Sequence, residues 1–253
     1  MSKTMDDHLL RKFNEIETIH WWWEGRRELL RLLLKGKKPQ KILDVGCGTG
    51  ETMSFLTTMF PKAKLYGIDT SPTAIKFSKA RGHRNILNSS AAKMPFKSNS
   101  FDIILFLDVL EHIKDDQSVI LEAKRVLKKG GCIIITSPGL SFIWSAHDTE
   151  QGHQRRYTRR EIKRLAKGAS LKTSFISYFN FILSPPIIAI RLLSRLKPFR
   201  SFADYDRGIN FDIAKVGLLN KTMKQIFINE VRALKYVRYP FGISIGAMLV
   251  KTK

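Results

Sequence analysis

The sequence has 253 residues, of which 43% are apolar, and a formal net charge of +22. This length and apolar content suit one α/β domain with an elaboration. Two cysteines, Cys47 and Cys132, exclude a disulfide framework and show no metal-ligand spacing, so we expect no metal site. Because the charged N-terminus also lacks the apolar core of a signal peptide, we expect a cytoplasmic protein.

The positive charge is concentrated in the C-terminal part of the chain. Residues 151–253 hold 21 Lys and Arg against 5 Asp and Glu, whereas residues 1–150 hold 23 against 17. A surface of this kind attracts nucleic acid, anionic lipid headgroups or phosphate-bearing substrates. A solvated, generally lysine-rich surface is the alternative interpretation.

In chain order, an amphipathic helix at His20–Leu34, entered by three tryptophans, precedes an alternation of strands and helices. Strands are predicted at Lys41–Val45, Lys64–Ile68, Asn85–Asn88, Phe101–Leu107 and Cys132–Ser137, with helices at Glu51–Met59, Pro72–Ala80, Asp116–Leu127 and from Arg159 to Ala166. This alternation predicts a doubly wound, mostly parallel sheet with helices on both faces.

Two segments extend this predicted core. Phe175–Ile190 has sixteen residues without a charge and is broken by Pro185 and Pro186, so it is too short to span a bilayer comfortably. It suits either an interfacial membrane element or a pair of buried helices under a cap. Ile243–Val250 is predicted to form a last strand at the sheet edge.

A glycine turn follows the first predicted strand. Gly46, Gly48 and Gly50 stand at alternate positions, and Asp69 follows nineteen residues after Gly50 at the end of the second strand. Glycines let backbone N–H groups approach a ligand closely, and an acid at this place can accept hydrogen bonds from both hydroxyls of an adenosine ribose.

Four segments in this order resemble the class I S-adenosylmethionine (SAM) methyltransferases: Ile42–Gly50, Gly67–Asp69, Ala91–Ile113 and Arg125–Gly139. The flanks, His20–Arg27 and Tyr239–Lys253, are similar to the bacterial ubiquinone-biosynthesis-like type. The resemblance implies a Rossmann-like fold with SAM as cofactor. It also implies a helical lid at residues 1–40, a SAM-binding core at 41–172 and an apolar, basic cap with a final strand at 173–253.

The resemblance also implies a set of cofactor-binding residues. Asp44 would hold the ammonium end of SAM, the glycines would leave room for its backbone, and the residues around Ala91 would line its adenine. One departure is Ser90, because the family often has an aspartate there. The expected cofactor contacts are Asp44, Gly46, Gly48, Gly50, Asp69, Ser90, Ala91, Met94, Leu107 and Asp108.

The acceptor-binding residues are expected in Ser145–Thr158, where this fold places acceptor loops. His153 or His147 would serve as a general base, with Tyr157 as a further catalytic candidate. Arg155 and Arg156 would clamp a phosphate or carboxylate, and Trp22 would contact the substrate. Alternatively, the segment is only a helix entry that Thr158 caps. Glu111 and His112 suit either helix-start packing or a direct role.

These features predict a SAM-dependent methyltransferase that acts on a small amphiphilic, lipid-linked or envelope-glycan acceptor, with peripheral contact to an anionic membrane. An RNA methyltransferase and a non-catalytic SAM-binding protein are the alternatives. Nucleic acid is disfavoured because Leu107–Leu110 replaces the N-P-P-Y element of adenine methylation, and Cys132 lies too deep in an apolar run to attack cytosine. The sequence does not indicate an oligomeric state.

Overall fold

One seven-stranded sheet forms the centre of the molecule in a computed structural model that describes residues 7–193, 196 and 217–252, except the side chains at 146 and 147. The strand order is β3-β2-β1-β4-β5-β7-β6, and β7 runs antiparallel to both of its neighbours. The strands are β1 (Lys41–Val45), β2 (Lys64–Asp69), β3 (Ile86–Asn88), β4 (Phe101–Leu107), β5 (Leu127–Pro138), β6 (Lys172–Phe179) and β7 (Ser244–Val250).

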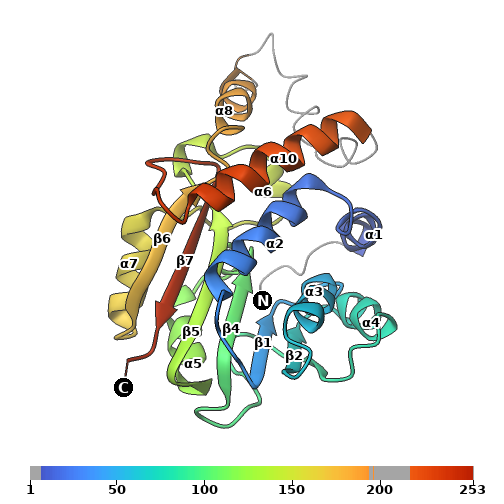
Figure 1. Cartoon of the computed structure of the whole chain (residues 1–253), viewed down its shortest axis with the longest axis vertical. Coiled ribbons are helices and arrows are strands. Elements are labelled where there is room, and N and C mark those ends of the chain that lie inside the picture. Colours follow the sequence, from blue (N-terminus) through green and yellow to red (C-terminus); the bar gives the residue numbers. More distant parts are fainter. Residues whose placement is uncertain (1–6, 194–195, 197–216, 253) are drawn as a thin grey trace.

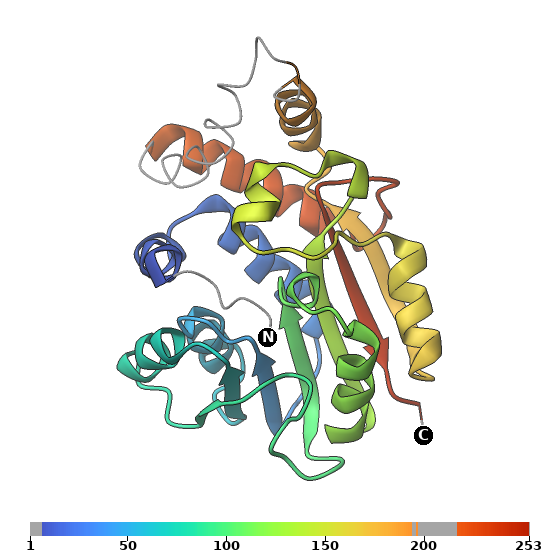
Figure 2. The same ribbon diagram turned by 180° about the vertical axis from the view of Figure 1, so that it is seen from behind.

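Helices cover both faces of this sheet (Figure 1). They are α1 (Asp7–Ile16), α2 (Trp21–Leu34), α3 (Glu51–Met59), α4 (Pro72–Ala80), α5 (Asp116–Val126), α6 (Ala146–Glu150), α7 (Arg159–Gly168), α8 (Ser184–Leu193) and α10 (Gly217–Ala233), with 3-10 turns η1 (Leu110–His112) and η2 (Ser141–Ile143). Apolar side chains of α5 and α7 pack in one core cluster, and those of α2 and α10 pack in another. Figure 2 shows α5 and α7 together on one face of the sheet.

The doubly wound, mostly parallel fold predicted from the sequence is confirmed. Ser71 caps α4 by accepting a hydrogen bond from the Ala74 N–H, and Pro72 occupies the first turn, as the sequence predicts. Thr158 caps α7 through a capping box with Glu161. Local signals of this kind fix helix starts because they satisfy backbone N–H groups that the helix itself leaves unpaired.

Two predictions about the C-terminal part are wrong. Phe175–Ile190 is not a pair of buried helices, because its first residues belong to β6 and only the later ones form α8. The last strand, β7, does not lie at the sheet edge, since β6 pairs along its outer side. Residues 173–253 therefore supply strands to the same sheet as the predicted core. Within the part of the chain that the structure describes, no helix has the length and apolarity to cross a bilayer.

Candidate active site

The turn after β1 places a glycine-rich stretch of backbone at the carboxyl edge of the sheet. Gly46 and Gly48 have φ of +69° and +53°, which side chains rarely adopt. The N–H groups of Gly46 and Cys47 donate to the Ile68 carbonyl, at 2.8 and 3.1 Å, and this fixes the turn against β2. A Cβ at Gly48 would meet no atom within 4 Å, so this glycine faces open space.

Asp69 ends β2 beside this turn and is held by backbone donors. Its Oδ2 accepts from the Gly48 N–H at 2.9 Å, and its Oδ1 accepts from the Ser71 N–H at 2.8 Å. Burial raises the pKa of this carboxyl, while the backbone hydrogen bonds oppose the shift. Each carboxylate oxygen keeps a lone pair, so the group has the acceptor capacity that two ribose hydroxyls need.

Asp44 lies at the end of β1 and is buried, with 3% of its surface exposed. Burial raises its pKa to about 7; Asp69 and Glu51 add to the shift, and Arg26 opposes it. A buried carboxyl of this kind becomes much more favourable as an anion when a cation binds beside it. Asp44 therefore suits the ammonium group of an amino-acid ligand.

These residues line one end of a cavity of about 580 Å³. Most of the predicted cofactor contacts lie in its wall: Asp44, Gly46, Gly48, Asp69, Ser90, Ala91, Leu107 and Asp108. Gly50 and Met94 are not part of the lining. Gly50 begins α3, and Met94 is buried in the core with its N–H donating to Glu122. These two positions serve packing around the site.

Helix α2 covers this cavity with aromatic side chains. His20 begins the helix by accepting the Trp22 N–H at 3.1 Å. Trp22 stacks on Phe179 and Phe227, with ring centroids 5.8 and 5.5 Å away, and it lines the cavity. Because both partners are far away in the sequence, the position of Trp22 depends on tertiary packing rather than on helix propensity.

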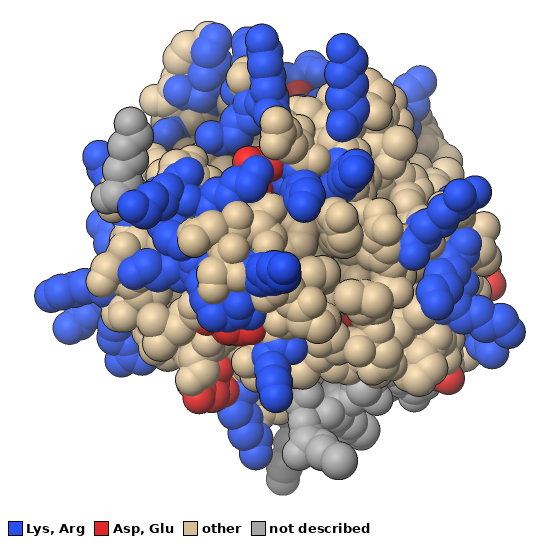
Figure 3. Space-filling view, turned by 90° about the horizontal axis from the view of Figure 1, so that it is seen from below, with Lys and Arg blue, Asp and Glu red and all other residues tan. Residues whose placement is uncertain are grey.

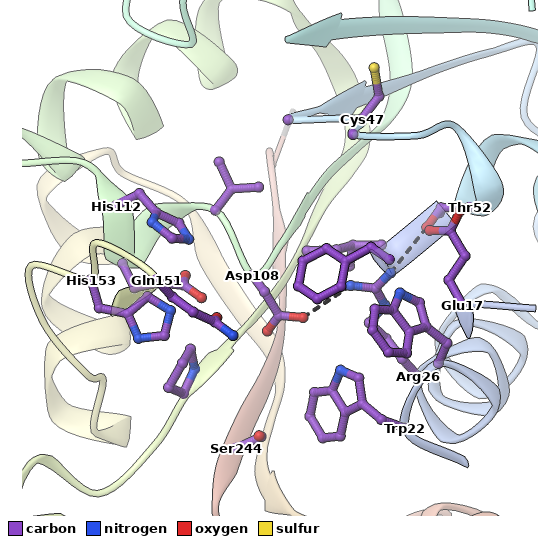
Figure 4. Close-up of a pocket in the computed structure, with 18 of the residues that line it drawn as sticks. Glu17, Trp22, Arg26, Cys47, Thr52, Asp108, His112, Gln151, His153 and Ser244 are labelled. Atoms are coloured by element: carbon purple, nitrogen blue, oxygen red, sulfur yellow. Dashed lines mark hydrogen bonds and ion pairs between the residues drawn. The ribbon is translucent and has the colours of Figure 1, made fainter. Parts of the chain in front are cut away.

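Two arginines of α2 form ion pairs that link this helix to the core. Arg26 donates to Asp108 Oδ2 at 3.0 Å and to Thr52 Oγ1 at 3.3 Å (Figure 4). The adjacent Arg27 pairs with Glu51 of α3. Asp108 itself has a φ of +58°, a strained value for a non-glycine residue, and its N–H donates to the Thr136 carbonyl. Asp108 is therefore fixed at the middle of the cavity.

On the other side of Asp108 lie His112, Gln151 and His153 (Figure 4). The Nδ1 of His153 is 2.8 Å from Asp148 Oδ1, and the guanidinium of Arg156 binds both oxygens of Asp148 at 2.9 Å. These contacts hold the pKa of Asp148 well below its usual range although burial alone would raise it. His153 and Arg156 line the cavity. Because the Asp148 carboxylate already binds the guanidinium of Arg156, this arginine is not an anion clamp of the predicted kind.

Tyr157 and Arg155 do not line the cavity. The Tyr157 hydroxyl donates to Asp116 Oδ2 at 2.7 Å, and burial raises its pKa far above the usual value. Arg155 pairs with the same carboxylate at 2.7 Å. Both predicted site residues thus hold the loop before α7 in place through Asp116. His147 lies outside the residues whose side chains are described.

Several lining residues were not predicted to belong to the site. The apolar end of the cavity is formed by α8 and α10 together with β7, which share no local motif; its residues include Leu183, Pro186, Ile187, Ile190, Met223 and Ile243. Glu111 and His112, for which the sequence left two roles open, both line the cavity. Burial, and His153 beside it, lower the pKa of His112 to about 4, so its imidazole is neutral.

The sheet order, with the glycine turn and Asp69 at its carboxyl edge, matches the Rossmann-like fold of class I SAM-dependent methyltransferases. Residues 43–135 match the family model described as a methyltransferase domain. The match covers less than half of the 253-residue chain. An open cradle at Gly48, the carboxylate of Asp69 and the buried Asp44 fit SAM as its cofactor.

Similar proteins include methyltransferases with different named acceptors. Demethylmenaquinone methyltransferase of Geobacillus stearothermophilus is 34% identical over 139 residues, which cover 51% of this chain and 59% of that protein. Malonyl-[acyl-carrier protein] O-methyltransferase of Legionella pneumophila is 31% identical over 132 residues, which cover 48% of this chain and 46% of that protein. The matches thus span about half the length of these curated relatives.

A solved structure shares the fold over nearly the whole chain. Phosphoethanolamine N-methyltransferase 2 of Haemonchus contortus, in complex with phosphomonomethylethanolamine and S-adenosylhomocysteine, has a TM-score of 0.64 at 18% identity. The alignment covers 98% of this chain and 58% of that one. At this identity the likeness concerns the fold alone.

Proposed function

We propose that this protein transfers the methyl group of SAM to a small amphiphilic or lipid-linked acceptor. One observation carries the proposal: the cavity that begins at the glycine turn continues without interruption to an apolar wall on α8. A site that bound only the cofactor would not need that second end. Ligand pockets of this kind combine apolar walls with a few placed polar groups.

The cofactor end would bind SAM through Asp44 at the ammonium, Asp69 at the ribose, and Ser90 with Ala91 at the adenine. When bound, SAM supplies a methyl group on a sulfonium, which is electrophilic without any proton transfer. The chain therefore has to align an acceptor and exclude water. Trp22 and the other aromatic side chains of α2 supply that cover.

The acceptor end would receive an apolar tail. Ile187 and Ile190 of α8, Met223 of α10 and Trp22 of α2 line it. Polar side chains line the middle of the cavity, where Asp108 and His153 face it (Figure 4), and Arg191 adds a charged group on α8. An amphiphilic molecule would thus place its polar head beside the methyl group and its tail along α8. The named activities of the relatives, on demethylmenaquinone and on a malonyl-[acyl-carrier protein], agree with acceptors of this kind.

Apolar side chains near the α8 end of the molecule support a peripheral contact with lipid as part of this proposal. Ile182 and Leu192 are 51% and 40% exposed, and Leu218 at the start of α10 is 79% exposed. Exposed leucines beside a cavity with an apolar wall would let an acceptor enter from a membrane surface.

The positive charge does not favour RNA as the acceptor. On the face seen from below, Lys and Arg side chains are spread over the described surface and separated by uncharged residues (Figure 3). Binding of a nucleic acid would call for a continuous basic stripe with accessible aromatic side chains. Trp21, Trp22 and Trp23 instead pack against other aromatic rings.

The test is methyl transfer from radiolabelled SAM into a bacterial lysate that is then separated into lipid extract, RNA and protein. We expect label in the lipid extract, and mass spectrometry of that fraction would identify the product. Label confined to RNA would overturn the acceptor class. A folded protein that binds SAM but labels no fraction would contradict the transfer itself.

A further inference from the structure

Three potential metal ligands converge on the middle of the cavity. One ligand atom each from Glu111, His112 and His153 lies within 4.8 Å of the other two. The imidazole centroids of His112 and His153 are 4.9 Å apart at an interplanar angle of 73°. His112 and His153 also lie on the same side of Asp108 (Figure 4). Two residues of η1 thus meet a loop residue that comes some forty positions later.

Each histidine already uses one ring nitrogen in a hydrogen bond with the protein. The Nδ1 of His153 pairs with Asp148, which is 0% exposed, and the ring of His112 bonds the backbone of Gly152. Metal-binding histidines typically have such a second partner, because it fixes the tautomer and the ring orientation. One nitrogen of each ring remains for a ligand in the cavity.

Glu111 supplies an independent observation. Its side chain is 0% exposed, its Oε2 accepts from Ser137 Oγ at 3.0 Å, and its Oε1 has no hydrogen-bond partner among the residues that the structure describes. A buried carboxyl oxygen without a partner is unfavourable. A cation beside Oε1 would remove that cost.

We propose that Glu111, His112 and His153 bind one divalent transition-metal ion at the acceptor end of the cavity. Two imidazole nitrogens and one carboxylate oxygen suit Mn²⁺, Fe²⁺, Co²⁺ or Zn²⁺, whereas Mg²⁺ and Ca²⁺ prefer oxygen ligands. A set of three protein ligands leaves coordination positions open toward the cavity. The sequence shows no sign of this site, because its ligands come from two segments without a metal-binding motif.

The metal site would make the acceptor atom a hydroxyl oxygen. The catalytic role of the ion rests on the proposed function, which this assignment makes more specific. An ion held by Glu111, His112 and His153 would supply Lewis-acid chemistry: it would ease loss of the acceptor hydroxyl's proton to solvent. The acceptor oxygen would then bond to the methyl carbon of SAM as the carbon–sulfur bond breaks, with its electron pair remaining on sulfur. His153 would hold the ion and would not act as the general base.

The test is direct metal binding to the tag-free, full-length protein after EDTA treatment. We expect Co²⁺ to bind one ion per chain, with a visible absorption band, and Zn²⁺ to displace it. The double variant His112→Ala/His153→Ala should bind Co²⁺ at least about 100-fold more weakly, and Glu111→Gln should also weaken it. The control is His8→Ala, which removes an exposed histidine of α1 outside the cavity.

A titration with S-adenosylhomocysteine separates this proposal from the proposed function and verifies folding of each variant. Wild-type protein that binds S-adenosylhomocysteine but no Co²⁺, Zn²⁺ or Mn²⁺ would overturn the metal site and leave the methyltransferase proposal intact. Co²⁺ binding that persists unchanged in the double variant would place the ion elsewhere and overturn the site as well.

Discussion

The cofactor end of the cavity is made by neighbouring strands of the sheet, whereas the acceptor end is assembled from segments that are far apart in the chain. Asp44, Gly48 and Asp69 lie within 26 residues of one another, and backbone hydrogen bonds between β1 and β2 fix their positions. Trp22, His153 and Ile187 come from three separate segments. The first end depends on local geometry, and the second depends on how the whole chain packs.

This difference implies that the two ends can be disrupted separately. The largest effect is expected from Asp69→Ala at the cofactor end. Two ribose hydroxyls would lose their acceptor at about 1–3 kcal/mol each, so S-adenosylhomocysteine should bind at least about 30-fold more weakly by calorimetry. The matched control is Asp115→Ala, which removes an exposed carboxylate that caps α5. Equal affinities for the two variants would remove the ribose role of Asp69.

At the acceptor end we expect Ile187→Asn to reduce methyl transfer into lipid extract by about tenfold, because an amide would replace part of the apolar wall. The affinity for S-adenosylhomocysteine should stay within about twofold of wild type. Leu121→Asn on α5 is the control, since Leu121 is 45% exposed and lies outside the lining. A loss of cofactor affinity in Ile187→Asn would contradict the separation of the two ends.

Proton release should accompany cofactor binding at Asp44. Burial raises the pKa of this group to about 7 in the free protein, so a bound ammonium that favours the carboxylate must expel a proton near neutral pH. Affinity should therefore rise by up to about tenfold between pH 6 and pH 8. Calorimetry in buffers of different ionisation enthalpy measures the number of protons released on binding, and Asp44→Asn should abolish this release. A pH-independent wild-type affinity would show that Asp44 does not face the ammonium.

The smallest effect is expected away from the cavity, at the capping box of α7. Thr158→Ala removes the acceptor for the Glu161 N–H and should lower the free energy of unfolding by about 1 kcal/mol, or the Tm by about 2–4 °C. Cofactor affinity should not change. A marked loss of S-adenosylhomocysteine binding in this variant would mean that the loop before α7 affects the cofactor end of the cavity.

The same contrast explains what could be predicted from the sequence. Gly48 and Asp69 were found because a turn and the end of a neighbouring strand leave local patterns, and Ser71 and Thr158 were found because caps do so too. The sequence did not predict β6, since its burial depends on pairing with β7 across some seventy residues. Tyr157 and Arg155 suggested chemistry by residue type alone, but both pair with Asp116 away from the cavity.

The most direct test of the whole account is a calorimetric titration of the purified protein with SAM. We expect the protein to bind one SAM per chain in competition with S-adenosylhomocysteine, and we expect Asp69→Ala to weaken this binding strongly. A folded protein that takes up no SAM would contradict the assignment of the glycine turn, and with it both the proposed transfer and the catalytic role of the metal site.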